Sequence, residues 1–337
     1  MSYRSSVLAC ASLAAVGAIA ASGPALAQAD GCSGAPETAS VTMMADWLPW
    51  ASQGPMVAAQ LAGYYADRGL EVDIVSPANP ADPIKLVASG QVEFSLTYVP
   101  EIMLAHEAGI PVISVATTLR VLSSGLFFLT DREIDGPEDL SGMTLGVGPK
   151  QDAQAFLDTV LEAGGLTRDD VEVVDPGYAH IPMILAGQID AAHGLTYSEG
   201  MAAAEAEGED AIRWLLYSDF GVPAFYYQVL AANTEWIEAN PNTTCHFLAG
   251  TMQGLEDWLA DPTAALEQIA TANEQFTPEQ HLGIYQGTEG HWVVDGVALR
   301  QDASVWSEAA EWARHRGLIT EDLPPETYFT NAYLAAE

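Results

Sequence analysis

The chain contains one structural pattern twice, and this internal repeat constrains the fold more than any other feature. Residues 88–109 and 185–208 share a Gly-Gln turn, an apolar stretch that ends in Thr-Tyr, and a following helical segment. In both copies the Gly-Gln turn follows an earlier helix-ending glycine, by 21 residues in the first copy and 22 in the second. Matching order and spacing predict two α/β lobes built alike.

The first copy begins with the stretch 46–75. It predicts a strand that ends at Trp47, an aromatic loop, a helix with Pro55 in its first turn and Gly69 as its left-handed cap, and then a second strand. The second copy begins at Met143 with the same order of elements. Loops between a strand end and a helix N-terminus are where open α/β sheets hold small ligands.

After Tyr217 the chain returns to a strand and a run of helices that lack a third copy of the pattern. We therefore expect an α/β protein of two lobes with a central cleft. Lobe 1 is predicted to hold residues 40–133 and 222–337, and lobe 2 residues 134–221. The crossings between them are placed near 132–140 and 217–222, and a ligand in such a fold sits between the lobes.

Residues 1–27 are predicted to be a cleaved signal peptide. Arg4 is their only charged residue, an apolar run follows it, and Ala25-Leu26-Ala27 fits a cleavage site. The apolar run is interrupted too soon for a membrane span, which needs about 20 residues. We expect a mature protein exported to the periplasm, with residues 28–39 as a flexible tail.

Two cysteines, Cys32 and Cys245, remain after the predicted cleavage. An oxidising compartment permits a bridge between them. Because Cys32 lies in the predicted tail, a buried or idle Cys245 is the preferred interpretation, with pairing left open. The sequence contains no C-x-x-C pair of the kind that binds zinc, and we expect no bound metal.

The composition is strongly acidic. Eleven Lys and Arg oppose 46 Asp and Glu, for a formal net charge of -35. This excludes nucleic acid and anionic membrane surfaces as good partners. The acids are scattered along polar stretches, which indicates a solvated surface more than a catalytic cluster.

Several segments resemble one family of proteins. They are W-x-x-W-x-x-x-G-x-x-x-A at 47–58, GYYADRGLEVDI at 63–74, VASGQVEF at 87–94, SSGL at 123–126 and GVPAFYYQVLAAN at 221–233. Over about residues 40 to 275 the chain resembles periplasmic substrate-binding proteins of ABC importers. The branch it resembles binds the pyrimidine precursor of thiamine, and it is similar to the taurine, sulfonate and nitrate binders.

The resemblance implies a type II periplasmic-binding fold, a small-molecule solute, a membrane permease as partner, and a monomer. One branch of similar fold is a pyrimidine synthase that uses a histidine in the first lobe and a cysteine-rich motif. Here the first ligand loop offers Gln53 and no histidine, and no cysteine-rich run exists. We therefore expect a binding protein without catalytic residues or cofactors.

Aromatic and polar side chains at the predicted strand ends and cleft loops are the candidate ligand contacts. A flat ring could stack on Trp47 or Trp50, although core packing explains Trp47 as well. Tyr98 and Tyr197 end equivalent strands of the two copies, so their hydroxyls would face the cleft from opposite sides. The candidates are Trp47, Trp50, Gln53, Tyr98, Glu101, Ser123, Ser124, Tyr178, His193, Tyr197 and Tyr226.

Other interpretations stay open for several candidates. Glu101 begins a helix, where a carboxylate is favourable through the helix dipole alone. His193 is as compatible with a structural histidine as with a ligand contact. Only Arg120 and Lys150 supply cations near predicted cleft loops, so aromatic residues outnumber them. This favours a neutral or weakly cationic flat heterocycle; a sulfonate, nitrate or flavin-type solute, or a synthase activity, is the alternative.

Overall fold

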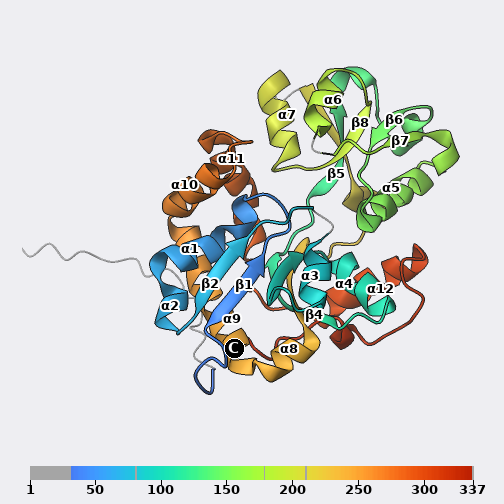
Figure 1. Cartoon of the computed structure of the whole chain (residues 1–337). Coiled ribbons are helices and arrows are strands. Elements are labelled where there is room, and N and C mark those ends of the chain that lie inside the picture. The colour runs from blue at the N-terminus through green and yellow to red at the C-terminus, as the bar shows by residue number, and fades with distance from the viewer. Residues whose placement is uncertain (1–31, 80–81, 178, 209–210, 336–337) are drawn as a thin grey trace, which may run out of the picture.

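The computed structural model describes residues 32–79, 82–177, 179–208 and 211–335. Within them the chain forms two five-stranded sheets with helices packed against both (Figure 1). The predicted α/β class with two lobes is confirmed. The predicted signal peptide and Tyr178 lie outside the described residues.

The first sheet has β3 (Phe94–Thr97) at its centre and combines strands from both halves of the chain. Its order is β2 (Glu71–Val75), β1 (Ser40–Met44), β3, β10 (Gln228–Asn233) and β4 (Val112–Leu119). The strand β1 pairs in parallel with β2 and β3, whereas β10 runs antiparallel to β3 and β4. A strand from the second half of the chain therefore completes a sheet begun by the first half.

The second sheet repeats this pattern. Its order is β7 (Glu172–Val174), β6 (Thr144–Gly146), β8 (Ala191–Leu195), β5 (Ser124–Leu129) and β9 (Ile212–Leu216). Here β6 pairs in parallel with β7 and β8, and β5 runs antiparallel to β8 and β9. The predicted internal repeat is confirmed at the level of strand pairing, with β5 and β10 in equivalent places.

The helices divide between the two sheets. Those beside the first sheet are α1 (Gly54–Ala62), α2 (Tyr64–Asp67), α3 (Pro83–Ala88), α4 (Val99–Glu107), α8 (Thr234–Ala239), α9 (Pro241–Ala260), α10 (Thr263–Ala272), α11 (Pro278–Thr288) and α12 (Ala303–His315). Those beside the second are α5 (Gln151–Ala163), α6 (His180–Leu185) and α7 (Glu199–Glu207). In Figure 1 α5 lies next to α12, so the lobes also approach each other beside the sheets.

The first strand and helix are shorter than the sequence predicted. β1 ends at Met44 and leaves Trp47 in the loop. The expected single helix stops at Gly63, which adopts a left-handed φ of 81°, and continues as α2 to Asp67. A residue with positive φ cannot continue an α-helix, and glycine takes that conformation without strain.

The first crossing between the sheets comes earlier than predicted. We expected it near residues 132–140, with residues 125–130 in lobe 1. Instead β5 is hydrogen-bonded to β8 and β9, so the chain has entered the second sheet by Ser124. The strand pattern of residues 124–129 is equally compatible with either sheet, and only the pairing partners decide between them. On this pairing we propose that the lobes are joined by residues 120–123 and 217–227.

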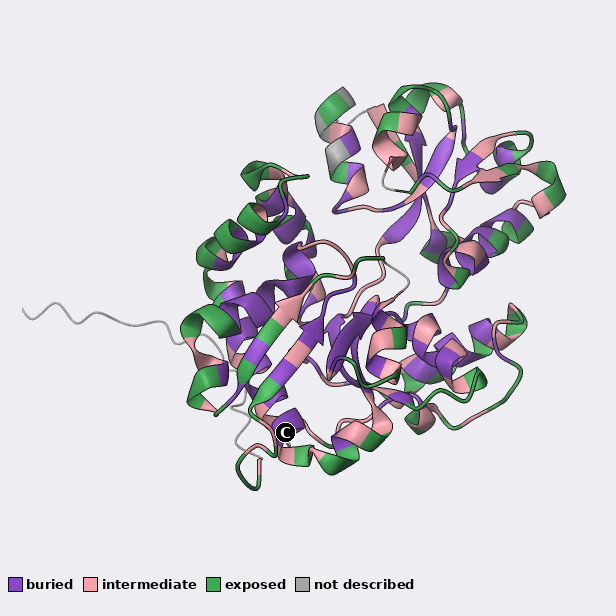
Figure 2. Cartoon of the chain, in the orientation of Figure 1, coloured by how far each residue is buried: buried purple, intermediate pink, exposed green. Residues whose placement is uncertain are grey.

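Large apolar side chains fill the space between sheets and helices. The strands are mostly buried and the outer helix faces are exposed (Figure 2). One buried cluster continues from one sheet's helices to the other's: the ring of Phe156 on α5 lies 5.5 Å from Trp312 on α12. The same Trp312 donates from Nε1 to the Thr159 hydroxyl at 3.3 Å. Apolar packing therefore joins the lobes on this side.

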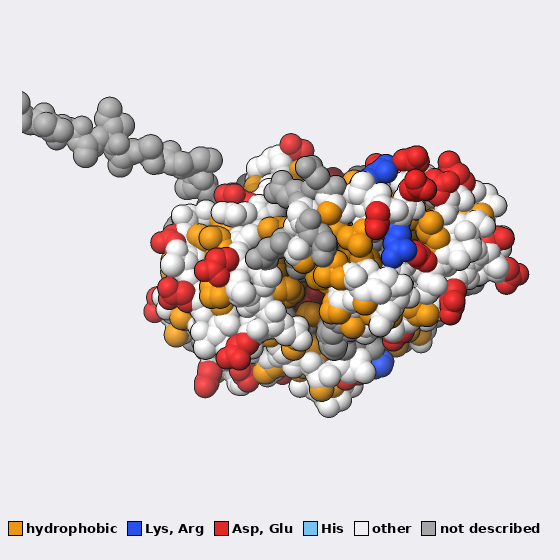
Figure 3. Space-filling model, turned by 90° about the horizontal axis from the view of Figure 1, so that it is seen from above, with side chains coloured by type: hydrophobic (Ala, Val, Ile, Leu, Met, Phe, Trp, Pro, Cys, Tyr) orange, Lys and Arg blue, Asp and Glu red, His pale blue; other side chains and the backbone are white. Residues whose placement is uncertain are grey.

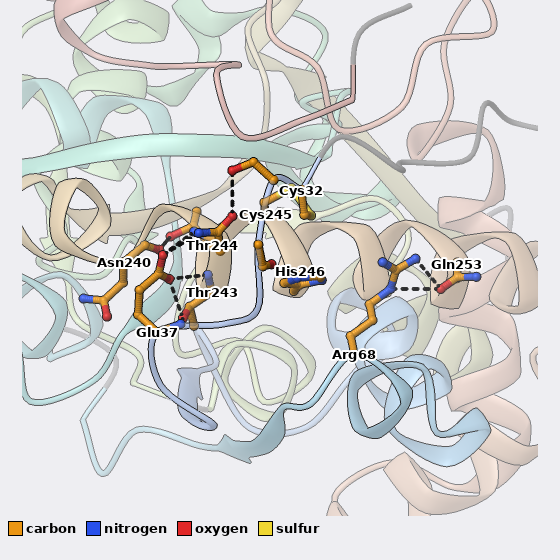
Figure 4. The surroundings of a disulfide bond; sticks show 12 residues. Cys32, Glu37, Arg68, Asn240, Thr243, Thr244, Cys245, His246 and Gln253 are labelled. Carbon is orange, nitrogen blue, oxygen red and sulfur yellow. Dashed lines mark hydrogen bonds between the residues drawn. A yellow bond between two sulfur atoms is a disulfide. The ribbon is translucent and has the colours of Figure 1, made fainter.

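The preferred interpretation of an idle Cys245 is wrong, because Cys32 and Cys245 form a disulfide with a Cα–Cα distance of 5.6 Å (Figure 4). The bond closes a loop across 213 residues of sequence. A crosslink over so long a loop removes much conformational freedom from the unfolded chain and stabilises the fold by roughly 2–5 kcal/mol. Sequence spacing carries no information about this pairing because the two residues are 213 positions apart and only the tertiary fold brings them together.

Residues 32–39 are held against α9, contrary to the flexible tail that we expected. The Glu37 carboxylate accepts hydrogen bonds from the backbone N–H groups of Asn242 at 3.1 Å and Thr243 at 2.8 Å (Figure 4). These are first-turn N–H groups of the 20-residue helix α9, whose own N-cap residue Asn240 makes no side-chain cap bond. Glu37 thus caps the helix from 205 residues away in sequence, and its charge also complements the helix dipole.

In the described part of the chain, no helix combines the length and the apolar character that a membrane span requires.

The Glu37 cap predicts a specific pH dependence of stability. Burial alone would raise the pKa of Glu37, but the backbone N–H groups of Thr243 and Asn242 outweigh it and lower the pKa from 4.5 to about 2. A depressed folded-state pKa means that the stabilisation is present above pH 4.5 and is lost as the pH falls toward 2. We expect Glu37→Gln to lower the free energy of unfolding at neutral pH, with a difference from the wild type that shrinks over that range.

Urea unfolding from neutral to acidic pH measures this difference. The neutral change Ser33→Ala, in the same segment, is the control and should show no such pH-dependent difference. A Glu37→Gln effect that stays constant across the pH range would contradict the role of the charged carboxylate.

Candidate functional site

A buried carboxylate organises the loop that follows β1. Asp46 is 2% exposed. Its Oδ1 atom accepts hydrogen bonds from Trp50 Nε1 at 3.2 Å, Ser52 Oγ at 3.3 Å and Gln53 Nε2 at 3.3 Å. Gln53 also accepts from the Trp50 backbone N–H at 2.9 Å, which closes the turn. The loop therefore folds back around one charged group and fixes the position of the Trp50 ring.

The start of α4 supplies the next part of the site. Tyr98 is the residue before the helix, and its hydroxyl donates to Asp46 Oδ2 at 2.7 Å. Burial, followed by the negative charge of Asp46, raises the pKa of Tyr98, so the hydroxyl stays protonated and remains a donor. One turn later, Glu101 accepts a hydrogen bond from the Thr97 hydroxyl.

A lysine from the other lobe reaches these groups. Lys150, just before α5, places Nζ 3.7 Å from Glu101 Oε1 and 4.4 Å from the centroid of the Tyr98 ring. Burial raises the pKa of Glu101, with the charge of Asp152 adding to it and that of Lys150 opposing it. Burial by itself would lower the pKa of Lys150. The negative charges of Glu101 and Asp152 outweigh this effect and raise the pKa of Lys150. The pair is thus an ion pair that spans the two lobes.

Four aromatic rings stand around Asp46. Trp50 of lobe 1 and Tyr197 of lobe 2 face each other at 6.2 Å between centroids, only 11° from parallel. Tyr227 lies 6.5 Å from Tyr197 and 5.2 Å from Tyr98. We call Trp50, Tyr98, Tyr197 and Tyr227 the aromatic box. Seen from above, the molecule is hollowed near its middle, with hydrophobic side chains around the hollow and acidic atoms at its floor (Figure 3).

The box contains a hydroxyl without a partner. Tyr197 is 2% exposed, and its OH makes no hydrogen bond. Burial raises the pKa of Tyr197, and the negative charges of Glu199 and Asp46 raise it further. A buried polar group without a partner costs free energy unless a water or ligand satisfies it.

Two sequence candidates, Tyr226 and His193, contact other parts of the molecule. The Tyr226 hydroxyl accepts from the Asp302 backbone N–H at 2.8 Å, and its ring lies 5.0 Å from the Arg120 guanidinium. His193 Nδ1 pairs with the Tyr217 hydroxyl at 2.9 Å. Burial, together with neighbouring positive charge, lowers the pKa of His193 to about 3, so the imidazole is neutral near pH 7.

The serines of the first crossing contribute differently. Ser123 bonds the Thr196 hydroxyl at 2.8 Å and so links the crossing to the strand end before Tyr197. The neighbouring Ser124 is 3% exposed, and its hydroxyl has no partner. Trp47 is half-buried beside the core of lobe 1. Its contact with a ligand stays a prediction.

Sequence reasoning did not select Asp46 or Tyr227 and mentioned Lys150 only as a nearby cation. Asp46 could have been found as the one acid between the first strand and its aromatic loop. Tyr227 could not be separated from Tyr226, because neighbouring residues of an extended segment face opposite sides. Among the described residues, no three His, Cys, Asp or Glu side chains gather closely enough to hold a metal ion.

Known proteins resemble this chain over most of its length. The family described as NMT1/THI5 like matches residues 50–265. The chain belongs to this family. Among its relatives, the formylaminopyrimidine-binding protein of Halalkalibacterium halodurans is 31% identical over 298 residues, covering 86% of this chain and 89% of the relative.

Family members with this sequence similarity include enzymes as well as binding proteins. The 4-amino-5-hydroxymethyl-2-methylpyrimidine phosphate synthase of Schizosaccharomyces pombe is 26% identical over 317 residues, covering 89% of this chain and 87% of that protein. Among solved structures, the periplasmic aliphatic sulphonate-binding protein SsuA from Escherichia coli superposes with a TM-score of 0.68 at 14% identity. The match covers 88% of this chain and 99% of SsuA. The fold is therefore the type II periplasmic-binding fold of this family's relatives.

Two glycines allow α11 to approach lobe 2. A Cβ on Gly287 would lie 2.5 Å from Tyr197 Cβ, and one on Gly283 would lie 2.5 Å from the end of the Met201 side chain. Tyr197 and Met201 belong to the start of α7 and the loop before it. The helix α11 thus seats the segment that carries a wall of the aromatic box, and only a residue without Cβ fits at Gly287.

We expect Gly287→Val to hold the lobes apart, because its side chain would overlap Tyr197. Small-angle scattering should give a larger radius of gyration than for the wild type. Gly290→Val is the matched control, since a Cβ on Gly290 meets nothing within 4 Å. Equal radii for Gly287→Val and the wild type would show that α11 does not limit closure.

Proposed function

We propose that this protein is an extracytoplasmic solute-binding protein that closes its lobes on a small flat heteroaromatic solute and delivers it to the permease of an ABC transporter. The observation that carries the proposal is the pair Trp50 and Tyr197, two nearly parallel rings from opposite lobes. A planar ring between them would gain stacking on both faces. Asp46 and the unpartnered Tyr197 hydroxyl supply polar groups at its edge.

The spacing of the two rings fits a site that opens to admit its ligand. Their centroids are 6.2 Å apart. A ring between two others needs about 7 Å, twice the optimal carbon contact distance of roughly 3.5 Å. A small separation of the lobes about residues 120–123 and 217–227 would provide the difference. Hinge closure of this kind excludes water from the bound solute.

Several observations support the location and the class of solute. A relative of similar length is named as a formylaminopyrimidine-binding protein. The disulfide between Cys32 and Cys245 suits an oxidising compartment, in accord with export by a signal peptide at residues 1–27.

The contacts of the two nearby cations argue against an inorganic or sulfonate anion. Arg120 donates to the Arg300 carbonyl and stacks on Tyr226, and Lys150 faces Glu101. The charge of Lys150 is therefore already paired with a carboxylate. Arg120 has a buried Nε without a hydrogen-bond partner, but its other contacts are to the Arg300 carbonyl and to Tyr226, which is not one of the four rings of the aromatic box.

We propose binding without turnover. His193, a half-buried histidine of lobe 2, is neutral near pH 7 and already bonded to Tyr217. The synthases among the relatives make the opposite outcome worth testing. Formation of a pyrimidine phosphate by the purified protein, followed by mass spectrometry, would assign an enzyme instead.

A calorimetric screen tests the proposal. We expect aminopyrimidines or similar heterocycles to bind, and Trp50→Ala to weaken binding by about 10- to 100-fold because one stacking face is lost. Trp50→Phe is the matched control, since it keeps an aromatic face and should retain most of the affinity. Trp47→Ala measures the contribution of the neighbouring ring. Tight binding of taurine or nitrate alone, or unchanged affinity in Trp50→Ala, would contradict this function.

A further inference from the structure

The Asp46 carboxylate is buried with neutral partners only. Its four hydrogen-bond donors are the side chains of Trp50, Ser52, Gln53 and Tyr98. In the part of the chain that the structure describes, no Lys or Arg forms an ion pair with it. Neutral donors reduce the cost of burying the charge but do not cancel it. Asp46 therefore keeps a negative field at the floor of the box.

The walls of the box suit a cation as well as a flat ring. The face of an aromatic ring carries partial negative charge and attracts a cation within about 6 Å of its centroid. The protein already shows this interaction at one wall, where Lys150 Nζ lies 4.4 Å from the Tyr98 centroid. Aromatic rings arranged around a space are a recurring means of recognising organic cations.

The balance of charge in the cleft also favours a positive ligand. Lys150 is a cation that reaches the box, and the charges of Glu101, Asp152 and Asp46 all raise its pKa. Three carboxylates thus act on one ammonium group. In a site shielded from water, such an excess attracts a further positive charge and repels a negative one.

The Tyr197 hydroxyl is a second, independent sign of a ligand. It is buried, has no partner, and senses the charge of Asp46 from the opposite lobe. A ring nitrogen or exocyclic amine lying between Trp50 and Tyr197 would be close to this hydroxyl. It would also lie beside the loop that Asp46 organises.

We propose that the cleft selects flat heteroaromatic solutes that carry a positive charge, on a protonated or alkylated ring nitrogen, and that Asp46 determines this preference. The inference rests on the proposed function, in which a flat ring enters between Trp50 and Tyr197. The inference specifies the charge of the solute and names Asp46 as the residue that recognises this charge.

The test compares two probes of one shape. Isothermal titration of the full mature protein uses 4-amino-2-methylpyrimidine and its N-methylated cation, at a pH well above the pKa of the parent ring. We expect the cation to bind about tenfold more tightly, the size of effect that a desolvated cation–aromatic contact supports. Equal or tighter binding of the neutral ring would overturn the inference and leave the proposed function standing. Failure of both rings to bind would overturn the proposed function itself.

Two variants locate the preference. Asp46→Asn keeps the size of the side chain and removes its charge, so the ratio of the two affinities should fall to about one. Lys150→Gln removes the competing ammonium without touching Asp46, so the ratio should rise above that of the wild type. Each measurement is the ratio of the affinities for the cation and for the neutral ring. A general defect in lobe closure would weaken the binding of both rings alike, so it would not change this ratio. An unchanged ratio in folded Asp46→Asn, or a lower ratio in Lys150→Gln, would show that Asp46 does not set the preference.

Discussion

The buried carboxylate of Asp46 is the constraint on which the cleft depends. A charge removed from water needs hydrogen bonds, and the chain supplies them from the following loop and from the start of α4. These hydrogen bonds fold the loop back on itself, orient Trp50 and bring Tyr98 toward β1. The geometry of one wall of the site therefore follows from satisfying one group.

The opposite wall depends on how the lobes meet. Tyr197 faces Trp50, Lys150 faces Glu101, and Gly287 leaves room for the segment that carries Tyr197. Near the crossings, Trp312 and Phe156 join the lobes through apolar packing. Polar and aromatic contacts line the cleft, whereas apolar contacts hold its far side. This division suits a molecule whose cleft opens while its hinge side stays packed.

Much of the fold and part of the site could be predicted from the sequence, for reasons that particular residues show. Tyr98 and Tyr197 follow the equivalent strands β3 and β8 of the repeat, and both belong to the aromatic box. Tyr226 and Tyr227 offered no such guide, because adjacent side chains in an extended segment point to opposite faces and both are aromatic. Lys150 was visible as a cation, but its partner Glu101 lies 49 residues away on the other lobe.

The sequence by itself determined the repeated α/β pattern, the family and the aromatic loop after the first strand. These features follow from local periodicity, turn residues and short motifs that act within a few residues of each other. Only the tertiary structure decided that residues 124–129 pair in the second sheet, that Cys32 meets Cys245, and that Asp46 lies inside the aromatic box. Each of these joins segments far apart in the chain, and such contacts are selected by packing and hydrogen bonding in the folded molecule, which local sequence does not encode.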